Sequence, residues 1–345
     1  MFGIVALSGR RGMIYGCHVF GDASMTDFVR TPDENFDMVS DFPHAPNYHT
    51  WQDLRMHYVD VGPRDGPVML LLHGMPTWAY LYRDMIGPLV DAGFRCIAPD
   101  HMGFGRSDKP TDVHWYTIAR HTEILTSMIT ALDLNRITLV CQDWGGPIGL
   151  AQAAMMPNRF EHLVIMNTWL HHDGYEYSDA IRNWNRNWHE GGLFHRAEPD
   201  VGLLLVLSAG LADRRTVFGA IVEGKDPGLT GEAARVYQGF SAPYRGLPDA
   251  AYNGMRRFPL SIPISSPDNG NAAAQELHYR TLLGWQKGVQ FVWGCVDDVF
   301  TEAWGRTWAE RMGSARFDGI EDADHFLQST HGGRVAELII DGRRA

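Results

Sequence analysis

The sequence lacks both an excess of basic residues and any long apolar run. Its 30 Lys and Arg residues are outnumbered by 41 Asp and Glu residues, so the formal net charge is −11. Nucleic-acid-binding surfaces need clustered positive charge, and this composition therefore predicts no nucleic-acid partner. No apolar run approaches the roughly 20 residues that span a bilayer. We accordingly expect no membrane partner.

Cysteines are also scarce. The chain has four, and their spacing matches neither a metal-binding nor a redox motif: Cys17, Cys96, Cys141 and Cys295. The last three lie in strand-like runs, which predicts buried free thiols and a reducing, cytoplasmic location. Near the start, an apolar stretch precedes Arg10 and Arg11, the reverse of the order in a secretory signal. We expect residues 1–29 to be a disordered leader, with Met25 as an alternative start.

Short apolar runs alternate with helical patterns along most of the chain. Five runs are typical of buried strands: residues 67–74, 94–100, 136–143, 162–169 and 289–294. Helical periodicity occurs in residues 77–93, 117–134, 147–156 and 272–284. Strands separated by helices form a mostly parallel sheet covered on both faces. The alternating run 54–62 predicts an antiparallel edge strand.

This regularity stops between residues 170 and 257. The segment is rich in aromatic residues and helical patterns, and it contains no clear strand. An inserted helical cap over the carboxyl edge of the sheet is the simplest interpretation. The predicted organisation is thus an α/β core of residues 30–169 and 258–345, with a cap of residues 170–257.

The motif "QDWGG" places an aspartate where a strand turns into a helix. Many α/β hydrolases hold a serine nucleophile at this turn, in the pattern G-x-S-x-G, and Asp143 takes its place here. Aspartate is also common as a helix cap, which is the structural alternative. A serine that attacked a saturated carbon would form an ether that activated water cannot cleave, whereas a carboxylate forms a hydrolysable ester. Asp143 therefore indicates displacement at an sp³ carbon through a covalent alkyl-enzyme intermediate.

Two further reactive residues follow in the order nucleophile, acid, base that is typical of α/β-hydrolase triads. The motif "GCVDD" supplies Asp297 or Asp298 after a predicted strand, and "DADHFLQS" supplies His325. Taken alone, His325 would more commonly be structural. The combination favours a catalytic role, because parallel strands bring their carboxyl ends to one edge of the sheet.

From about residue 30 to the C-terminus, the chain resembles the haloalkane dehalogenases whose triad acid follows the strand after the cap. The motifs that carry the resemblance are "RTPDENF", "APNY", "HGMPTW", "APDHMGFGRSDKP", "QDWGG" and "VWGCVDD". The resemblance implies an α/β-hydrolase fold with Asp143 as nucleophile and His325 as base. The family spacing of three residues after Gly294 selects Asp297 as the triad acid.

The resemblance also implies a halide site made of two indole N–H groups. It assigns the first to Trp144, and the family spacing places the second on Trp184, with Trp188 one helical turn further along as the alternative. An indole donates one N–H, accepts nothing and carries no charge, which suits a halide in an apolar pocket. A tryptophan in a helical cap is otherwise more commonly a packing residue.

The chain departs from the family at "HGMPTW", because this branch usually has Glu where Met75 stands. The backbone N–H groups of Met75 and Trp144 would still form an oxyanion hole, since that role needs no side chain. The missing Glu puts efficiency and substrate preference in doubt.

The expected reaction converts a small apolar haloalkane to an alcohol, a halide ion and a proton, with no cofactor or metal, on a monomer. The main alternative is an epoxide hydrolase, which protonates its substrate with cap tyrosines. The candidates for that role are Tyr175, Tyr177, Tyr237, Tyr244 and Tyr252. Gln142 argues against this alternative, because epoxide hydrolases tend to have His there. A ligand-binding pseudoenzyme is a third possibility, and the complete triad argues against it.

Overall fold

The structure is a computed structural model that describes residues 26–190, 200–223, 226–264, 266, 268–313 and 316–344. Cys17 and the first 25 residues of the expected leader lie outside this part. Residues 26–29 of the expected leader are described, and β1 (Phe28–Val29) pairs with β6 (Lys109–Pro110) in a small antiparallel sheet.

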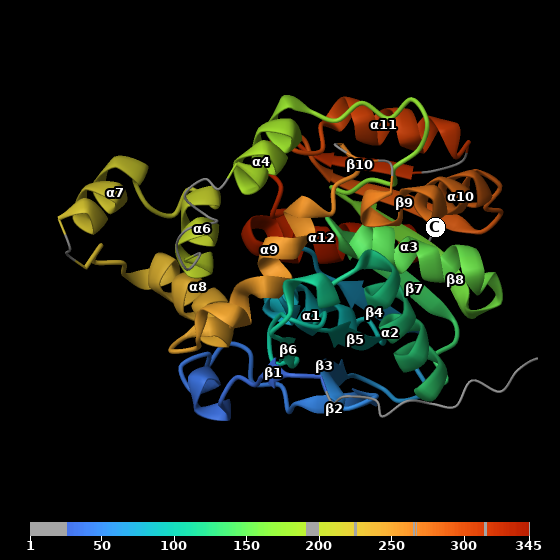
Figure 1. The fold of residues 1–345 in the computed structure, drawn as a ribbon. Coiled ribbons are helices and arrows are strands. Elements are labelled where there is room, and N and C mark those ends of the chain that lie inside the picture. The colour runs from blue at the N-terminus through green and yellow to red at the C-terminus, as the bar shows by residue number, and fades with distance from the viewer. Residues whose placement is uncertain are drawn as a thin grey trace, which may run out of the picture.

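Within the described residues, eight strands form the main sheet in the order β10-β9-β8-β7-β4-β5-β3-β2 (Figure 1). Their bounds are Asn47–Trp51 (β2), Leu54–Val61 (β3), Val68–Leu72 (β4), Arg95–Pro99 (β5), Ile137–Gln142 (β7), Phe160–Met166 (β8), Gly288–Gly294 (β9) and Arg316–Ile320 (β10). All pairings from β10 to β5 are parallel, and those of β3 with β5 and β2 are antiparallel. The predicted mostly parallel α/β sheet is confirmed.

The prediction of an edge strand at residues 54–62 is wrong in position. β3 is antiparallel as expected, but β2 pairs with its outer side and forms the edge. The run in β2, "NYHTW", is short and mostly half-exposed, so it carries little apolar alternation. For the same reason the sequence did not predict β10, whose residues are also mostly half-exposed.

Helices cover both faces of this sheet. The main core helices are α1 (Arg83–Asp91), α2 (Ile118–Ala131), α3 (Gly145–Met155), α10 (Ala272–Leu283), α11 (Glu302–Arg311) and α12 (Leu327–Arg344). α1 packs on α12, while α2 and α10 pack on α3. The chain runs from β4 to β5 on one side and then returns to β7 on the other side of β4. Because such crossovers are right-handed, α1 and the pair α2–α3 lie on opposite faces.

The reversal of strand order between β4 and β7 positions the site. In open α/β sheets, ligands bind outside the carboxyl ends of the strands at such a switch point. The loop after β4 begins at His73, and the loop after β7 begins at Asp143. Both strands are buried along their whole length, so the two loops rest on a rigid apolar base.

Helices fill the segment between β8 and α10, with no strand among its described residues. They are α4 (Asp179–His189), α6 (Val201–Ser208), α7 (Arg214–Val222), α8 (Gly231–Ser241) and α9 (Asn253–Leu260). The same segment also holds the short 3-10 helices η5 (Ala242–Tyr244), η6 (Asp249–Tyr252) and η7 (Asn269–Asn271). Those outside it are η1 (Asp33–Phe36), η2 (Ala79–Tyr82), η3 (Val113–Trp115) and η4 (Pro157–Arg159). In Figure 1, α6, α7 and α8 extend to the left of the sheet. The division into a core and a cap at residues 170–257 stays a prediction, and α9 crosses its expected end.

One side of the helical segment is fixed to the core by side chains from the "HGMPTW" motif and the helix after it. Trp78 Nε1 donates to the carbonyl oxygen of Gly239 at 3.0 Å. The rings of Tyr80 and Phe240 lie 5.1 Å apart in an edge-to-face arrangement. Both contacts hold α8 against the loop that follows β4, so the motif anchors the helical segment as well as shaping the loop.

The thiols are placed mostly as expected. Cys96 and Cys141 are free and buried, as predicted, whereas Cys295 is only partly buried because it lies just beyond the end of β9. No helix among the described residues is long and apolar enough to cross a membrane.

Candidate active site

Asp143 lies at the sharp turn between β7 and α3, with a φ angle of +50°. This left-handed conformation is strained for a residue other than glycine. It is held by two donors to the Asp143 carbonyl oxygen, the N–H of Gly146 at 2.9 Å and Oγ1 of Thr168 at 2.5 Å. The N-cap residue of α3 is Trp144, not Asp143, and no side-chain hydrogen bond caps the helix there. The helix-cap alternative for Asp143 is therefore not supported by the described cap contacts of α3.

The Asp143 carboxylate is instead held by the loop after β4. Its Oδ1 accepts a hydrogen bond from the Met75 N–H at 2.8 Å, and the Trp144 N–H also supports the charged form. A Cβ atom at Gly74 would lie 2.2 Å from Asp143 Oδ1. Only glycine therefore lets the two loops approach this closely. The two backbone donors are those expected to form an oxyanion hole.

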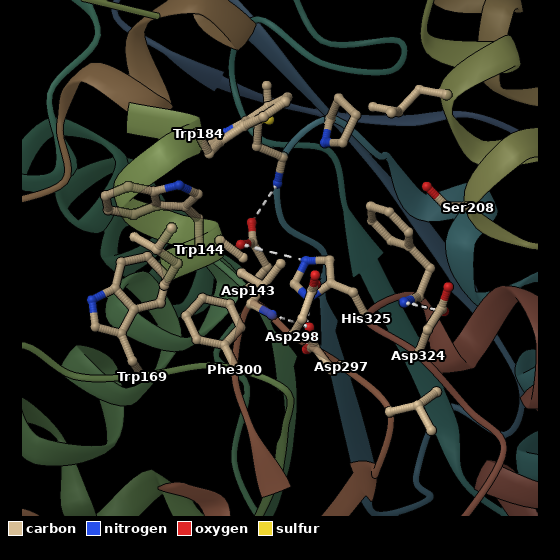
Figure 2. Close-up of a pocket in the computed structure, with 18 of the residues that line it drawn as sticks. Asp143, Trp144, Trp169, Trp184, Ser208, Asp297, Asp298, Phe300, Asp324 and His325 are labelled. Carbon is tan, nitrogen blue, oxygen red and sulfur yellow. Dashed lines mark hydrogen bonds and ion pairs between the residues drawn. The ribbon is translucent and has the colours of Figure 1, made fainter. Parts of the chain in front are cut away.

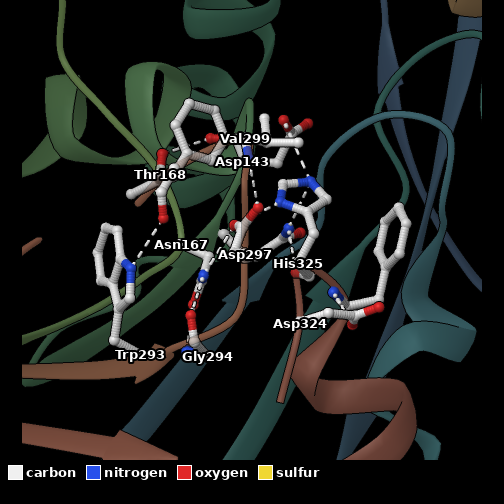
Figure 3. A network of polar contacts seen from close by, with 12 residues as sticks. Asp143, Asn167, Thr168, Trp293, Gly294, Asp297, Val299, Asp324 and His325 are labelled. Carbon is white, nitrogen blue, oxygen red and sulfur yellow. Dashed lines mark hydrogen bonds and ion pairs between the residues drawn. The ribbon is translucent and has the colours of Figure 1, made fainter. Parts of the chain in front are cut away.

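Asp297 and His325 form a second contact pair at the same edge of the sheet (Figure 3). His325 Nδ1 lies 3.0 Å from Asp297 Oδ2. The other oxygen, Oδ1, accepts the Val299 N–H at 2.7 Å, so the carboxylate is fixed at both ends. Asp298 is exposed, and among the described contacts none joins it to the imidazole. The geometry thus favours Asp297 over Asp298 as the partner of His325.

The imidazole lies between two carboxylates. His325 Nε2 is 3.8 Å from Asp143 Oδ2. Burial lowers the pKa of His325, but the charges of Asp297, Asp143 and Asp324 outweigh it and raise the pKa to about 9. Burial raises the pKa of Asp143, and the His325 charge and the two backbone donors oppose that shift. These groups are electrostatically coupled, as expected for acid–base chemistry in a desolvated cleft.

A mainly apolar cavity of about 320 Å³ opens above these groups (Figure 2). Aromatic and aliphatic side chains form most of its wall: Trp144, Trp169, Trp184, Phe300, Phe326, Ile181, Leu204 and Ile262. Asp143 and His325 lie at its base, and Ser208, Arg214 and Asp298 supply polar groups. Such a cavity suits a small apolar ligand, with its polar contacts concentrated at the reacting end.

The two candidate halide donors come from different elements. Trp144 is the N-cap residue of α3 and is buried, with its ring 4.7 Å from that of Trp169. Trp184 projects from α4 into the same cavity, and Figure 2 shows it near Asp143 and Trp144. Trp188 packs edge-to-face on Trp184 at 5.7 Å but does not line the cavity. Its position favours the sequence-based choice of Trp184.

Comparisons with known proteins identify the family. Residues 67–196 match the family model for the alpha/beta hydrolase fold. The haloalkane dehalogenase of Psychrobacter cryohalolentis is 36% identical over 90% of this chain and 96% of its own length. That of Mycobacterium marinum is 38% identical over 91% of this chain and 99% of its own. The chain belongs to the haloalkane dehalogenase family.

Solved structures of haloalkane dehalogenases support the same assignment. The tetrameric haloalkane dehalogenase DpaA from Paraglaciecola agarilytica superposes with a TM-score of 0.78 at 33% identity, covering 90% of this chain and 97% of that one. The expected family, fold and enzyme class, a hydrolase acting on carbon–halide bonds, are therefore confirmed.

Sequence reasoning missed one buried residue of this haloalkane dehalogenase site. Asn167 follows β8, and its Nδ2 donates to Asp297 Oδ2 at 2.8 Å and to the Gly294 carbonyl at 3.1 Å. Its own carbonyl accepts the Asp143 N–H at 3.0 Å. Asn167 therefore links the backbone of Asp143 to the side chain of Asp297. Its position directly after a buried strand was the signal that could have identified it.

Proposed function

We propose that Asp143 displaces halide from a saturated carbon and that His325, held by Asp297, activates the water that hydrolyses the resulting ester. The observation that carries this proposal is that the two carboxylate oxygens of Asp143 have different surroundings. Oδ1 is engaged by the Met75 N–H, while Oδ2 is directed toward His325 at 3.8 Å from Nε2. Oδ2 is thus the oxygen free to attack carbon, and Oδ1 becomes the carbonyl oxygen of the ester.

Halide departure follows from the cavity wall. As Oδ2 bonds to carbon, the carbon–halogen bond breaks and the halide takes the electron pair into an apolar space. Trp144 and Trp184 both line this space, and their indole N–H groups are suitable donors to an anion there. Bulk water cannot solvate the ion in such a cavity, so these donors would act mainly as charge develops.

The second step regenerates the enzyme. Water gives a proton to His325 Nε2 while its oxygen attacks the carbonyl carbon of the ester, Cγ of Asp143. The oxyanion that develops on Oδ1 stays within reach of the Met75 and Trp144 N–H groups. Collapse of this intermediate releases the alcohol and returns the carboxylate. Asp297 supports the imidazolium formed in between, as its 3.0 Å contact to Nδ1 allows.

The cavity size defines the substrate class further. A volume of about 320 Å³ lies at the lower end of the roughly 300–1,000 Å³ that is typical of small-molecule pockets. It therefore suits a small haloalkane better than a large ligand. Met75 lines the base where the family usually has Glu, which makes this end more apolar. We infer a preference for unbranched or lightly branched haloalkanes of intermediate length.

The epoxide hydrolase alternative receives no support from the cavity. None of the described residues that line it is a tyrosine. The Tyr244 hydroxyl donates to the Gly103 carbonyl at 3.2 Å, and the Tyr177 hydroxyl lies 2.8 Å from His171 Nδ1. An epoxide oxygen above Asp143 would therefore lack the expected phenol donors.

We also propose that the enzyme works as a monomer in the cytoplasm. The buried free thiols Cys96 and Cys141 support a reducing compartment. The described residues of one chain supply the triad and the cavity, so the site needs no second chain. Light scattering across a concentration series and subcellular fractionation test these two points.

The reaction is tested by measuring halide and proton release from chloro-, bromo- and iodoalkanes of two to twelve carbons, with styrene oxide in the same panel. We expect equal amounts of halide and acid, a maximum at intermediate length and no diol from styrene oxide. Diol formation without halide release would support the epoxide hydrolase instead. No substrate-dependent proton release at all would support the pseudoenzyme.

A further inference from the structure

Gln142, the last residue of β7, contacts the base of the triad directly. It is fully buried and stands one position before Asp143. Its Nε2 lies 3.1 Å from His325 Nε2 and 3.0 Å from the His325 carbonyl oxygen. One amide nitrogen therefore faces two atoms of the same histidine, across 183 residues of chain.

These two contacts determine the orientation of the Gln142 amide and the position of the proton on the His325 ring. The His325 carbonyl oxygen can only accept, so the Gln142 NH₂ group rather than its oxygen must face it. The second hydrogen of that NH₂ group then points to His325 Nε2, which must offer its lone pair. Asp297 accepts at the other side of the ring, 3.0 Å from Nδ1, so the proton of the neutral imidazole sits on Nδ1. All three contacts are satisfied together only in this tautomer.

We propose that Gln142 is a positioning residue that holds His325 in the unprotonated, Nδ1–H form that ester hydrolysis requires. A protonated Nε2 would place two donors face to face at 3.1 Å inside a buried site, which is unfavourable. The inference rests on the proposed function, because it assigns Gln142 to the hydrolytic half of that reaction.

The Gln142 side-chain amide and the carboxylates around His325 have opposite effects on the pKa of the imidazole. Carboxylates near His325 come from three loops, after β7, β9 and β10: Asp143, Asp297 and Asp324. Asp298 lines the same cavity but is exposed. Arg214 at the start of α7 is a cation that lines the same cavity. The carboxylates favour the imidazolium and raise the pKa of His325 to about 9 after the lowering effect of burial. Alkylation of Asp143 removes one of these charges, whereas the Gln142 contact needs no charge and can persist.

The contact also affects the return of the proton. During hydrolysis Nε2 accepts a proton from water and for that moment faces the Gln142 N–H groups as a donor. This repulsion shortens the life of the imidazolium and favours transfer of the proton to the departing groups or to solvent. Gln142 therefore opposes the carboxylates by lowering the pKa of His325, so that the unprotonated base forms at a lower pH than it would without this contact.

The test compares Gln142→Met, which keeps the length but removes the donor, with Gln142→Glu, which places an acceptor at the same site. Each variant is alkylated by a bromoalkane in a single turnover, and the decay of the alkyl-enzyme is followed by mass spectrometry from pH 5 to 10. The decay rate should fall at low pH, where His325 becomes protonated, and we call this part of the profile the acidic limb. In Gln142→Met, the midpoint of the acidic limb should move up by roughly half to one pH unit, with the high-pH plateau retained. The displacement should be larger in Gln142→Glu.

A matched control is Gln152→Met, because Gln152 is equally buried but lies on α3 and bonds Thr126 and the Thr122 carbonyl. Its acidic limb should coincide with that of the wild type. The tautomer is read directly from the ¹⁵N chemical shifts of His325 in the wild type above the midpoint of the limb, where Nε2 should resonate as an unprotonated nitrogen.

Two results would overturn the inference. One is an unchanged acidic limb in both Gln142 variants, with rates lowered equally at every pH, which would make Gln142 merely structural. The other is a wild-type ¹⁵N spectrum with the proton on Nε2. Failure of the proposed function is distinct, since no alkyl adduct would then form on Asp143 in any variant.

Discussion

The side chain of Asn167 donates at 2.8 Å to the same oxygen of Asp297 that faces His325. Asn167 Oδ1 in turn accepts the Gly294 N–H at 2.8 Å, which ties the end of β9 to the end of β8. The Asp297 carboxylate is thus oriented from the neighbouring strand as well as from its own loop.

Asn167→Ala should slow hydrolysis of the alkyl-enzyme by about tenfold while changing its formation less, because the Asp297 carboxylate loses one of its fixed donors. It should also lower the free energy of unfolding by about 1–3 kcal/mol, since the buried Gly294 amide is left without its partner. Urea denaturation and single-turnover kinetics measure the two effects. Equal slowing of both steps would contradict a role through Asp297.

The neighbouring carboxylates Asp297 and Asp298 should differ sharply. Asp297→Asn removes the negative charge that supports the imidazolium, so ester hydrolysis should fall by about 10²–10⁴-fold. Asp298→Asn should change it by less than about threefold, because Asp298 is exposed and, among the described contacts, none joins it to the ring. Single-turnover rates of the two matched variants decide the point, and a larger loss in Asp298→Asn would reverse the assignment.

The halide site is tested at Trp184. Trp184→Phe keeps an aromatic ring in the cavity but removes the N–H donor. A hydrogen bond to an ion is worth roughly 1.5–3 kcal/mol, so debromination should slow by about 10–150-fold and bromide binding should weaken. Quenching of tryptophan fluorescence by bromide measures binding.

Trp188→Phe is the matched control on the same helix, and it should behave like the wild type because Trp188 does not line the cavity. If the losses occur in Trp188→Phe instead, then the second donor is Trp188.

Acid stability should depend on the buried His121. Burial, with the charges of His73 and Arg120, lowers the pKa of His121 from 6.5 to about 3. Between these values the unfolded chain binds a proton that the folded chain does not, so stability falls as the pH falls from about 6.5 toward 3. The loss is up to about 1.4 kcal/mol per pH unit for this one group. Chemical denaturation at pH 7, 6, 5 and 4 should show a shallower decline in His121→Phe, and identical slopes would exclude His121 as a determinant.

The parts of the site that follow buried strands could be predicted from the sequence. Asp143 and Asp297 come directly after β7 and β9, and the parallel order of these strands brings them to one edge. Asn167 follows β8 in the same way and could have been found by the same rule. Trp184 required the family spacing, since helical periodicity alone does not separate it from Trp188.

Other features depend on tertiary contacts that no local pattern encodes. The contact between Gln142 and His325 joins residues far apart in the chain, and its meaning depends on which amide atom faces the ring. The edge strand β2 carries too few apolar residues to be read as a strand, because it gains its pairing only from β3. The conformation of Asp143, with positive φ, is likewise imposed by the surrounding loops.

The most direct test of the central claim uses His325→Gln incubated with 1-bromohexane and analysed by mass spectrometry of the intact and digested protein. Displacement needs Asp143 but not the base, whereas ester hydrolysis needs the base. We expect one hexyl group per chain, located on Asp143, with release of one bromide and no further turnover. Asp143→Ala under the same conditions should stay unmodified. An unmodified His325→Gln protein, or a hexyl group on any other residue, would contradict the assignment of Asp143 as the nucleophile.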